Sequence, residues 1–84
     1  IRDHPTIVAL ESPQARRLAS FLAGQELVVG VEVDERGRVI ARTDHAVGFY
    51  RALPGWLLAE GLPVEEIVTL DDSLQAVFDY LVGD

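Results

Sequence analysis

The sequence predicts an α+β domain in which a four-stranded sheet carries two helices on one face and a further helix closes the chain. Two observations predict this class. Segments with apolar residues spaced i, i+3, i+4 and i+7 alternate with short runs rich in β-branched residues. In addition, 84 residues suffice for one modest hydrophobic core but not for two. We therefore assign residues 1–5 to the end of a linker and residues 6–84 to a single small domain.

The first two predicted elements are a strand and a helix. Residues 6–10 are a compact apolar, β-branched run that Glu11 ends, as expected of a buried strand. Ser12 and Pro13 follow at the positions of a helix cap and a first helical residue, and Gly24 is expected to end the helix. The apolar stripe of this helix consists of Ala15, Leu18, Ala19 and Leu22.

A β-hairpin is predicted next. Residues 27–33 alternate as a half-buried strand does, and residues 34–37 supply a loop in which Gly37 accepts a positive φ. Residues 38–43 are predicted to form the second strand of the hairpin, with Arg38 and Arg42 on its solvent-exposed face. The core-facing residues are expected to be Leu27, Val29, Val31, Val33, Val39 and Ala41.

A second helix and a fourth strand follow the hairpin. Asp44 is placed to cap a helix that runs to Glu60, with Gly61 beyond its end. Because Pro54 removes a backbone hydrogen bond inside this segment, we expect a kink or two helical pieces near Leu53. Residues 64–70 are predicted as a strand at an exposed edge of the sheet, since two glutamates stand near its start.

The last stretch, from Leu70 to Gly83, predicts a short amphipathic helix. Asp71, Asp72 and Ser73 offer side-chain oxygens to its free N–H groups. The residues at i, i+3, i+4 and i+7 that form its apolar stripe are Leu74, Val77, Phe78 and Leu81. A helix this short needs a surface on which to bury that stripe.

The predicted order is therefore β-α-β-β-α-β-α. A split β-α-β unit repeated twice is the ferredoxin-like sandwich, an antiparallel four-stranded sheet with two helices on one face. The closing helix is an addition to that fold. It is expected to cover the open face of the sheet, to pack at its edge, or to dock on another chain.

The amino-acid composition of the chain disfavours some classes of binding partner. The chain has 14 acidic residues against 7 arginines and no lysine, a formal net charge of −7, which disfavours nucleic acid and anionic lipid surfaces. It has no cysteine and no apolar run near the roughly 20 residues that span a membrane. It begins at Ile1 and contains no methionine, so we expect it to be part of a longer protein.

The sequence indicates no catalytic, cofactor or metal site. Glycine-rich phosphate-binding motifs are absent, and neither His4 nor His45 has the neighbouring ligands that a metal requires. The acidic pairs at residues 34–35, 65–66 and 71–72 are interpreted as a loop, an edge strand and a helix cap. The candidate interaction surface consists of Phe49, Tyr50, Trp56, Leu74, Phe78 and Leu81.

Two stretches resemble one protein family. Residues 70–83 resemble the C-terminal signature of ATP-binding subunits of ABC transporters, in particular the ABC-2-type drug and multidrug exporters, many of which end in S-L-x-x-V-F followed by an aromatic or apolar residue, L and a small residue. Ser73-Leu74, Val77-Phe78 and Tyr80-Leu81 stand at the matching places. Residues 49–54, F-Y-R-A-L-P, with L-L-A-E-G at 57–61, are similar to the helix before the last strand of that accessory domain.

The resemblance implies a non-catalytic accessory or regulatory domain behind the nucleotide-binding domain of an exporter ATPase. ATP and magnesium would then bind that earlier domain, where the family's Walker motifs, LSGGQ signature and switch histidine belong. The implied partners are the nucleotide-binding domain of the same chain, a second copy in a homodimer, and membrane permease subunits. The implied location is cytoplasmic, at the inner face of the plasma membrane.

Two other functions remain open. A small-molecule sensor of the ACT type shares the β-α-β-β-α-β order and binds ligands at sheet-edge dimer interfaces, often near a glycine at the first strand-to-helix junction. That junction is Glu11-Ser12-Pro13 here and lacks the glycine often found in such domains. A stand-alone enzyme with a ferredoxin-like fold ranks last, because no catalytic constellation is present.

Overall fold

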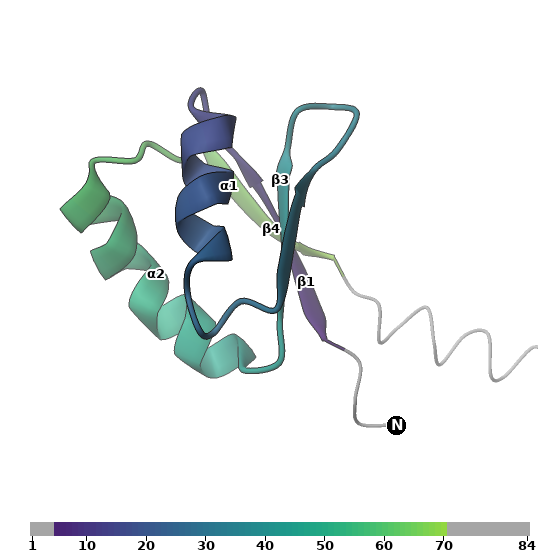
Figure 1. The fold of residues 1–84 in the computed structure, drawn as a ribbon, viewed down its shortest axis with the longest axis vertical. Helices are drawn as coiled ribbons and strands as arrows, with labels where there is room; N and C mark the ends of the chain where they lie inside the picture. Colours follow the sequence, from purple (N-terminus) through teal and green to yellow (C-terminus); the bar gives the residue numbers. More distant parts are fainter. Residues whose placement is uncertain (1–4, 71–84) are drawn as a thin grey trace, which may run out of the picture.

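The computed structural model describes residues 5–70 and shows an α+β domain with a four-stranded antiparallel sheet and two helices. The elements are β1 (Thr6–Glu11), α1 (Ala15–Ala23), β2 (Gly30–Val33), β3 (Val39–Thr43), α2 (Ala46–Glu60) and β4 (Glu66–Leu70). The strands lie in the order β2-β3-β1-β4, and every neighbouring pair is antiparallel. Both helices lie on the same side of the sheet (Figure 1). The predicted class is confirmed at this level, and the predicted closing helix lies outside the described residues.

The hydrophobic core lies between the sheet and the two helices. Val8 and Leu10 of β1 are fully buried and pair with Ala41 and Val39 of β3, which the sequence also assigned to the core. Because side chains alternate along a strand, Ile7 and Ala9 point to the opposite face. The helices contribute Leu18, Leu22, Phe49 and Leu53 to the core.

Helix α1 begins at Ala15, after a turn, and not at Pro13. The Ser12 hydroxyl accepts a hydrogen bond from the Gln14 N–H (3.0 Å) and donates one to the carbonyl of Pro63 (2.6 Å). This second bond joins residues 51 positions apart in sequence, so Ser12 holds the turn to the β4 side of the molecule. The predicted apolar stripe is correct, since Leu18 and Leu22 are buried.

Strand β2 is shorter than predicted and its first part has the opposite orientation. Residues 25–28 form a turn in which the Val28 N–H donates to the Gln25 carbonyl (3.0 Å). This turn buries Val28 and leaves Val29 exposed, whereas the alternation placed Val29 in the core. The strand begins only at Gly30, because a tight turn reverses the direction of the chain before the alternating pattern can take effect.

The hairpin between β2 and β3 has the predicted loop. Gly37 adopts φ 82°, and its N–H donates to the Asp34 carbonyl (2.9 Å). A residue with a side chain is strained at such a φ, so glycine suits this position.

Helix α2 runs from Ala46 to Glu60 as one element with Pro54 inside it, so the predicted division into two helical pieces is wrong. Pro54 is exposed, and its missing N–H removes one backbone hydrogen bond from the helix. Asp44 does not cap the helix. The Thr43 hydroxyl instead accepts the N–H of His45 (3.0 Å), the residue before the first helical one.

Strand β4 forms one edge of the sheet and pairs with β1 from Glu66 to Leu70. It starts two residues later than predicted, because Glu65 first donates its N–H to the Glu11 carbonyl (2.7 Å) as the chain joins the sheet. In residues 5–70, neither helix is long and apolar enough to cross a membrane.

Candidate functional site

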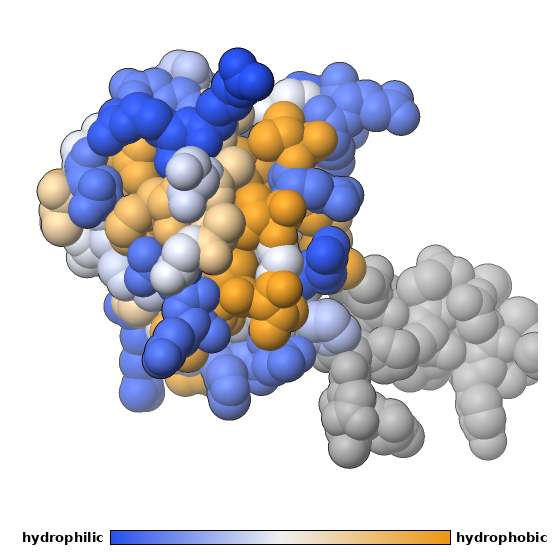
Figure 2. Space-filling model, in the orientation of Figure 1, coloured by the Kyte–Doolittle hydropathy of each residue, from blue (hydrophilic) through white to orange (hydrophobic). Residues whose placement is uncertain are grey.

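The free edge of β2 is the first candidate surface. Within the described part of the chain, β2 pairs with β3 on one side only, so its other side presents unpaired backbone groups. Val29, Val31 and Val33 line this edge, and we call them the valine edge. Figure 2 shows apolar side chains gathered along this side of the molecule between hydrophilic ones.

The valine edge is apolar and accessible at the same time. Val33 is 45% exposed and Val29 is 56% exposed, while Val31 is half-buried. Val31 and Val33 pair with Ala41 and Val39, so they lie on the helix-bearing face of the sheet. Helix α1 covers that face only in part, which leaves the outer valines available to an added strand or another apolar surface.

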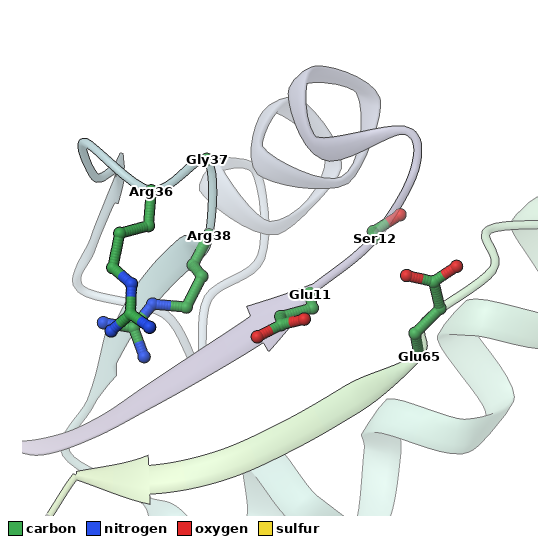
Figure 3. A pocket seen from close by; sticks show the side chains of 6 residues that line it. All are labelled: Glu11, Ser12, Arg36, Gly37, Arg38 and Glu65. Carbon is green, nitrogen blue, oxygen red and sulfur yellow. The ribbon is translucent and has the colours of Figure 1, made fainter.

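A polar hollow at one end of the sheet is the second candidate site. It has a volume of about 260 Å³ and lies where β1 ends, the β2–β3 hairpin turns and β4 begins. In Figure 3 the side chains of Arg36 and Arg38 lie on one side of the hollow, the Glu11 carboxylate points towards that side, and Glu65 stands on the far side. Ser12 and Gly37 complete the lining. Both signs of charge therefore border one small depression.

The hairpin side of the hollow is held by Asp34. One carboxylate oxygen accepts the N–H groups of Arg36 and Arg38 (2.9 Å each), and the other pairs with Arg38 Nε (2.9 Å). The hydrogen bond from the Arg38 N–H is the main cause that lowers the pKa of Asp34 from 3.8. The side-chain hydrogen bond of Arg38 and the Arg36 N–H act in the same direction, while desolvation opposes them. This network orients Arg38 and fixes the loop that carries Arg36.

The opposite side of the hollow is held by two hydrogen bonds to backbone carbonyls. The Ser12 hydroxyl donates to the Pro63 carbonyl, and the Glu65 N–H donates to the Glu11 carbonyl. These two bonds join the end of β1 to the segment that leads into β4. The hollow thus has a defined shape on both sides, built from segments far apart in sequence.

The predicted interaction residues lie in two places. Phe49 is fully buried, so in this structure it is a core residue and presents no surface to a partner. Tyr50 and Trp56 are half-buried and lie edge-on to Phe49, with ring centroids 5.5 and 5.9 Å away. The Tyr50 and Thr69 hydroxyls share a hydrogen bond that links α2 to β4. Leu74, Phe78 and Leu81 lie outside the described residues.

The other predicted polar residues occupy surface positions. His45 is exposed next to the first residue of α2, and Glu65 and Glu66 are exposed where the chain enters β4. The Asp34 carboxylate accepts hydrogen bonds within the β2–β3 hairpin, and its neighbour Glu35 is exposed. Across residues 5–70, no three histidine, aspartate or glutamate residues are grouped as metal ligands.

Sequence reasoning missed both candidate sites. Alternation of apolar residues assigned the valine edge to the core. The structure shows that β2 is an edge strand and that Val29 and Val33 are exposed. The hollow joins Glu11, Arg36 and Glu65, which no local spacing connects. In comparisons with known proteins, no family model, curated protein or solved structure matches this chain.

Proposed function

We propose that this chain is a non-catalytic accessory domain of an ABC exporter ATP-binding subunit and that it forms subunit contacts through its valine edge. In such a subunit the domain works at the cytoplasmic face of the membrane, beside a nucleotide-binding domain that supplies the ATP and magnesium site. The sequence resemblance at residues 49–61 and 70–83 supports this assignment.

We also propose that the fold is ferredoxin-like. The observed order of elements and the strand order β2-β3-β1-β4 support this proposal, because a split β-α-β unit repeated twice gives that arrangement. The two helices on one face support it as well (Figure 1).

The observation that carries the contact function is the free β2 edge with its exposed valines. A sheet edge offers unpaired N–H and C=O groups, and proteins usually protect such edges with charges, prolines or bulges. Of the four residues of β2, only Glu32 is charged. An edge of this kind suits addition of a strand, in which backbone hydrogen bonds join the sheets and side-chain contacts add affinity. A second copy that pairs its own β2 in antiparallel fashion satisfies both needs.

The first test is to read the coding sequence upstream of Ile1. A Walker A loop, an LSGGQ-like signature and a switch histidine within one or two domain lengths are expected. An unrelated enzyme domain there, or a start codon just before Ile1, would overturn the exporter assignment.

The second test addresses the contact surface in the parent protein. Val33→Lys places a charge on the valine edge, and Val47→Lys places one on the outer side of α2, where Val47 is also exposed. We expect Val33→Lys to weaken self-association in light-scattering measurements over a dilution series and Val47→Lys to leave it unchanged. Equal association by both variants and the parent would remove the valine edge as the contact surface.

The polar hollow favours a second candidate function, a small-molecule sensor of the ACT type. It lies at the junction of β1 and α1 and combines two arginines with two glutamates, which suits a zwitterion such as a free amino acid. A ligand that binds only the folded state raises the unfolding temperature with its concentration. A thermal shift on adding amino acids, lost in Arg36→Ala but kept in Arg51→Ala, would support the sensor over the exporter domain.

A further inference from the structure

The sheet has an apolar face that neither α1 nor α2 covers. Ile7 and Ala9 of β1 point away from the helices, and their partners across the sheet are Leu70 and Val68 in β4 and Arg42 and Ile40 in β3. We call Ile7, Ala9, Ile40, Val68 and Leu70 the open face. Val68 is 39% exposed, and Ile7 and Leu70 are half-buried, whereas Ala9 and Ile40 are buried, with 2% and 7% of their surface exposed.

Charged residues surround the open face. Glu11 and Glu66, which pair across β1 and β4, lie at one end of it. Arg42 pairs with Ile7 on one side and Gly30 on the other, so it separates the apolar residues from β2. An apolar centre with a polar rim is typical of a surface that another segment covers.

We propose that residues 71–84 of the same chain lie on the open face as an amphipathic helix. The point at which the described chain ends supports this occupant. Leu70, the last residue of β4, itself belongs to the open face and pairs with Ile7. Residues 71–73 can span roughly 10 Å when extended, so the stripe that starts at Leu74 has the reach to turn back over β1 and β4.

The sequence of residues 74–83 fits the size of this surface. A helix of that length extends about 15 Å at 1.5 Å per residue. Four strands about 4.8 Å apart span about 14 Å from the first to the last. The stripe of Leu74, Val77, Phe78 and Leu81 supplies one continuous apolar side.

The charge at the start of the tail also fits this occupant. Residues 71–84 carry four aspartates and no basic residue, and Arg42 lies at the end of the open face where the tail begins, whereas Glu11 and Glu66 lie at the other end. This inference is independent of the proposed exporter function.

A double-mutant cycle in the full chain tests the contact. Phe78→Ala is combined with Val68→Ala on the open face and, as a control, with Val47→Ala on the outer side of α2. If Phe78 packs on Val68, their effects on the unfolding equilibrium constant in urea depart from additivity by a factor of about 2 to 160. The Val47 pair is expected to be additive, and Gln75→Ala, off the stripe, is expected to be additive with Val68→Ala.

A measurement on the unsubstituted chain covers the case in which a variant fails to fold. Nuclear Overhauser contacts between the Phe78 ring and the methyl groups of Val68 or Ile40, unchanged on dilution, are the expected result. Absence of these contacts, together with additive effects of Phe78→Ala and Val68→Ala, would overturn the proposal. Contacts that disappear on dilution as a dimer dissociates would assign the open face to a second copy and overturn it too.

Discussion

The guanidinium group of Arg42 lies over Gly30, its partner across β2 and β3. A Cβ atom placed on Gly30 would stand 2.5 Å from Arg42 Nη2 and 3.0 Å from Cζ. Glycine at position 30 therefore permits Arg42 to extend flat across the β2 side of the open face. Strand β2 carries Val31 and Val33 on one face and this arginine contact at Gly30 on the other.

Gly30→Ala is expected to displace Arg42 without unfolding the domain, because the end of an arginine side chain moves easily. Alanine in a strand is favoured over glycine by about 0.5–1 kcal/mol, but loss of the Arg42 position offsets part of that gain. The same substitution in an Arg42→Ala background is expected to give the full gain. Urea unfolding of the four proteins measures the difference, and equal effects in both backgrounds would contradict the contact.

Asp34→Asn tests the hairpin network through its pH dependence. Because the pKa of Asp34 is lowered from 3.8 in the folded state, the unfolded chain takes up the proton at higher pH than the folded chain does. The stability that this carboxylate provides is full above pH 3.8 and decreases as the pH falls below that value. We expect the variant to be less stable than the parent near neutral pH and the gap to narrow in acid.

Urea midpoints measured from neutral pH down to pH 3 and below would follow this gap. Asp44→Asn removes one negative charge from an exposed position outside the hairpin and is the matched control. If Asp34→Asn and Asp44→Asn differ from the parent by the same amount at every pH, the hydrogen bonds of Asp34 are not the source of the pH-dependent stability.

Local patterns predicted most of the element order. The β-branched runs located β1, β3 and β4, and the i, i+3, i+4, i+7 stripe located α1. Within residues 5–70, the two glycines with positive φ, Gly37 and Gly61, were placed correctly because their role depends on local backbone geometry alone. The aromatic rings of α2 were recognised as a group, and the structure places Phe49 in the core.

The predictions from sequence were wrong or incomplete where contacts beyond the local pattern determine the structure. Ser12 holds the start of α1 through the carbonyl of Pro63, and no local signal reports that bond. Val28 and Val29 exchange the orientations that alternation assigns them, because the turn at residues 25–28 precedes β2. The hollow likewise depends on tertiary proximity of Glu11, Arg36 and Glu65. Sequence periodicity contains no information about such contacts.

Phe49→Ala is expected to destabilise the domain by about 3–5 kcal/mol, the usual loss for truncating a buried phenylalanine. Phe49 is fully buried and lies edge-on to Trp56 with an interplanar angle of 76°. Trp56 is the single tryptophan, so its fluorescence reports unfolding and any change in this contact. Val47→Ala, on the exposed side of the same helix, is expected to change stability by less than about 0.5 kcal/mol. Similar effects of both substitutions would contradict the core role of Phe49.

Two glycines, one inside α2 and one at its C-terminal end, are expected to change the stability in opposite directions when each is replaced by alanine. Gly61 has φ 63°, and the next residue, Leu62, donates its N–H to the Leu57 carbonyl (3.0 Å) to close the helix. A side chain in this left-handed conformation costs roughly 1–2 kcal/mol, so Gly61→Ala is expected to destabilise. Gly55 lies inside the helix with open space around its Cβ position, so Gly55→Ala is expected to stabilise by up to about 1 kcal/mol.

Thermal and urea unfolding of the two alanine variants measure this contrast with the same chemical change at both positions. Neither added methyl group meets an atom within 4 Å beyond its chain neighbours and the backbone of its own helix, so packing against the rest of the domain contributes to neither result. The opposite signs therefore report backbone conformation alone. A stabilising Gly61→Ala would show that the helix ends in another conformation, and a destabilising Gly55→Ala would show that the helix is interrupted after Pro54.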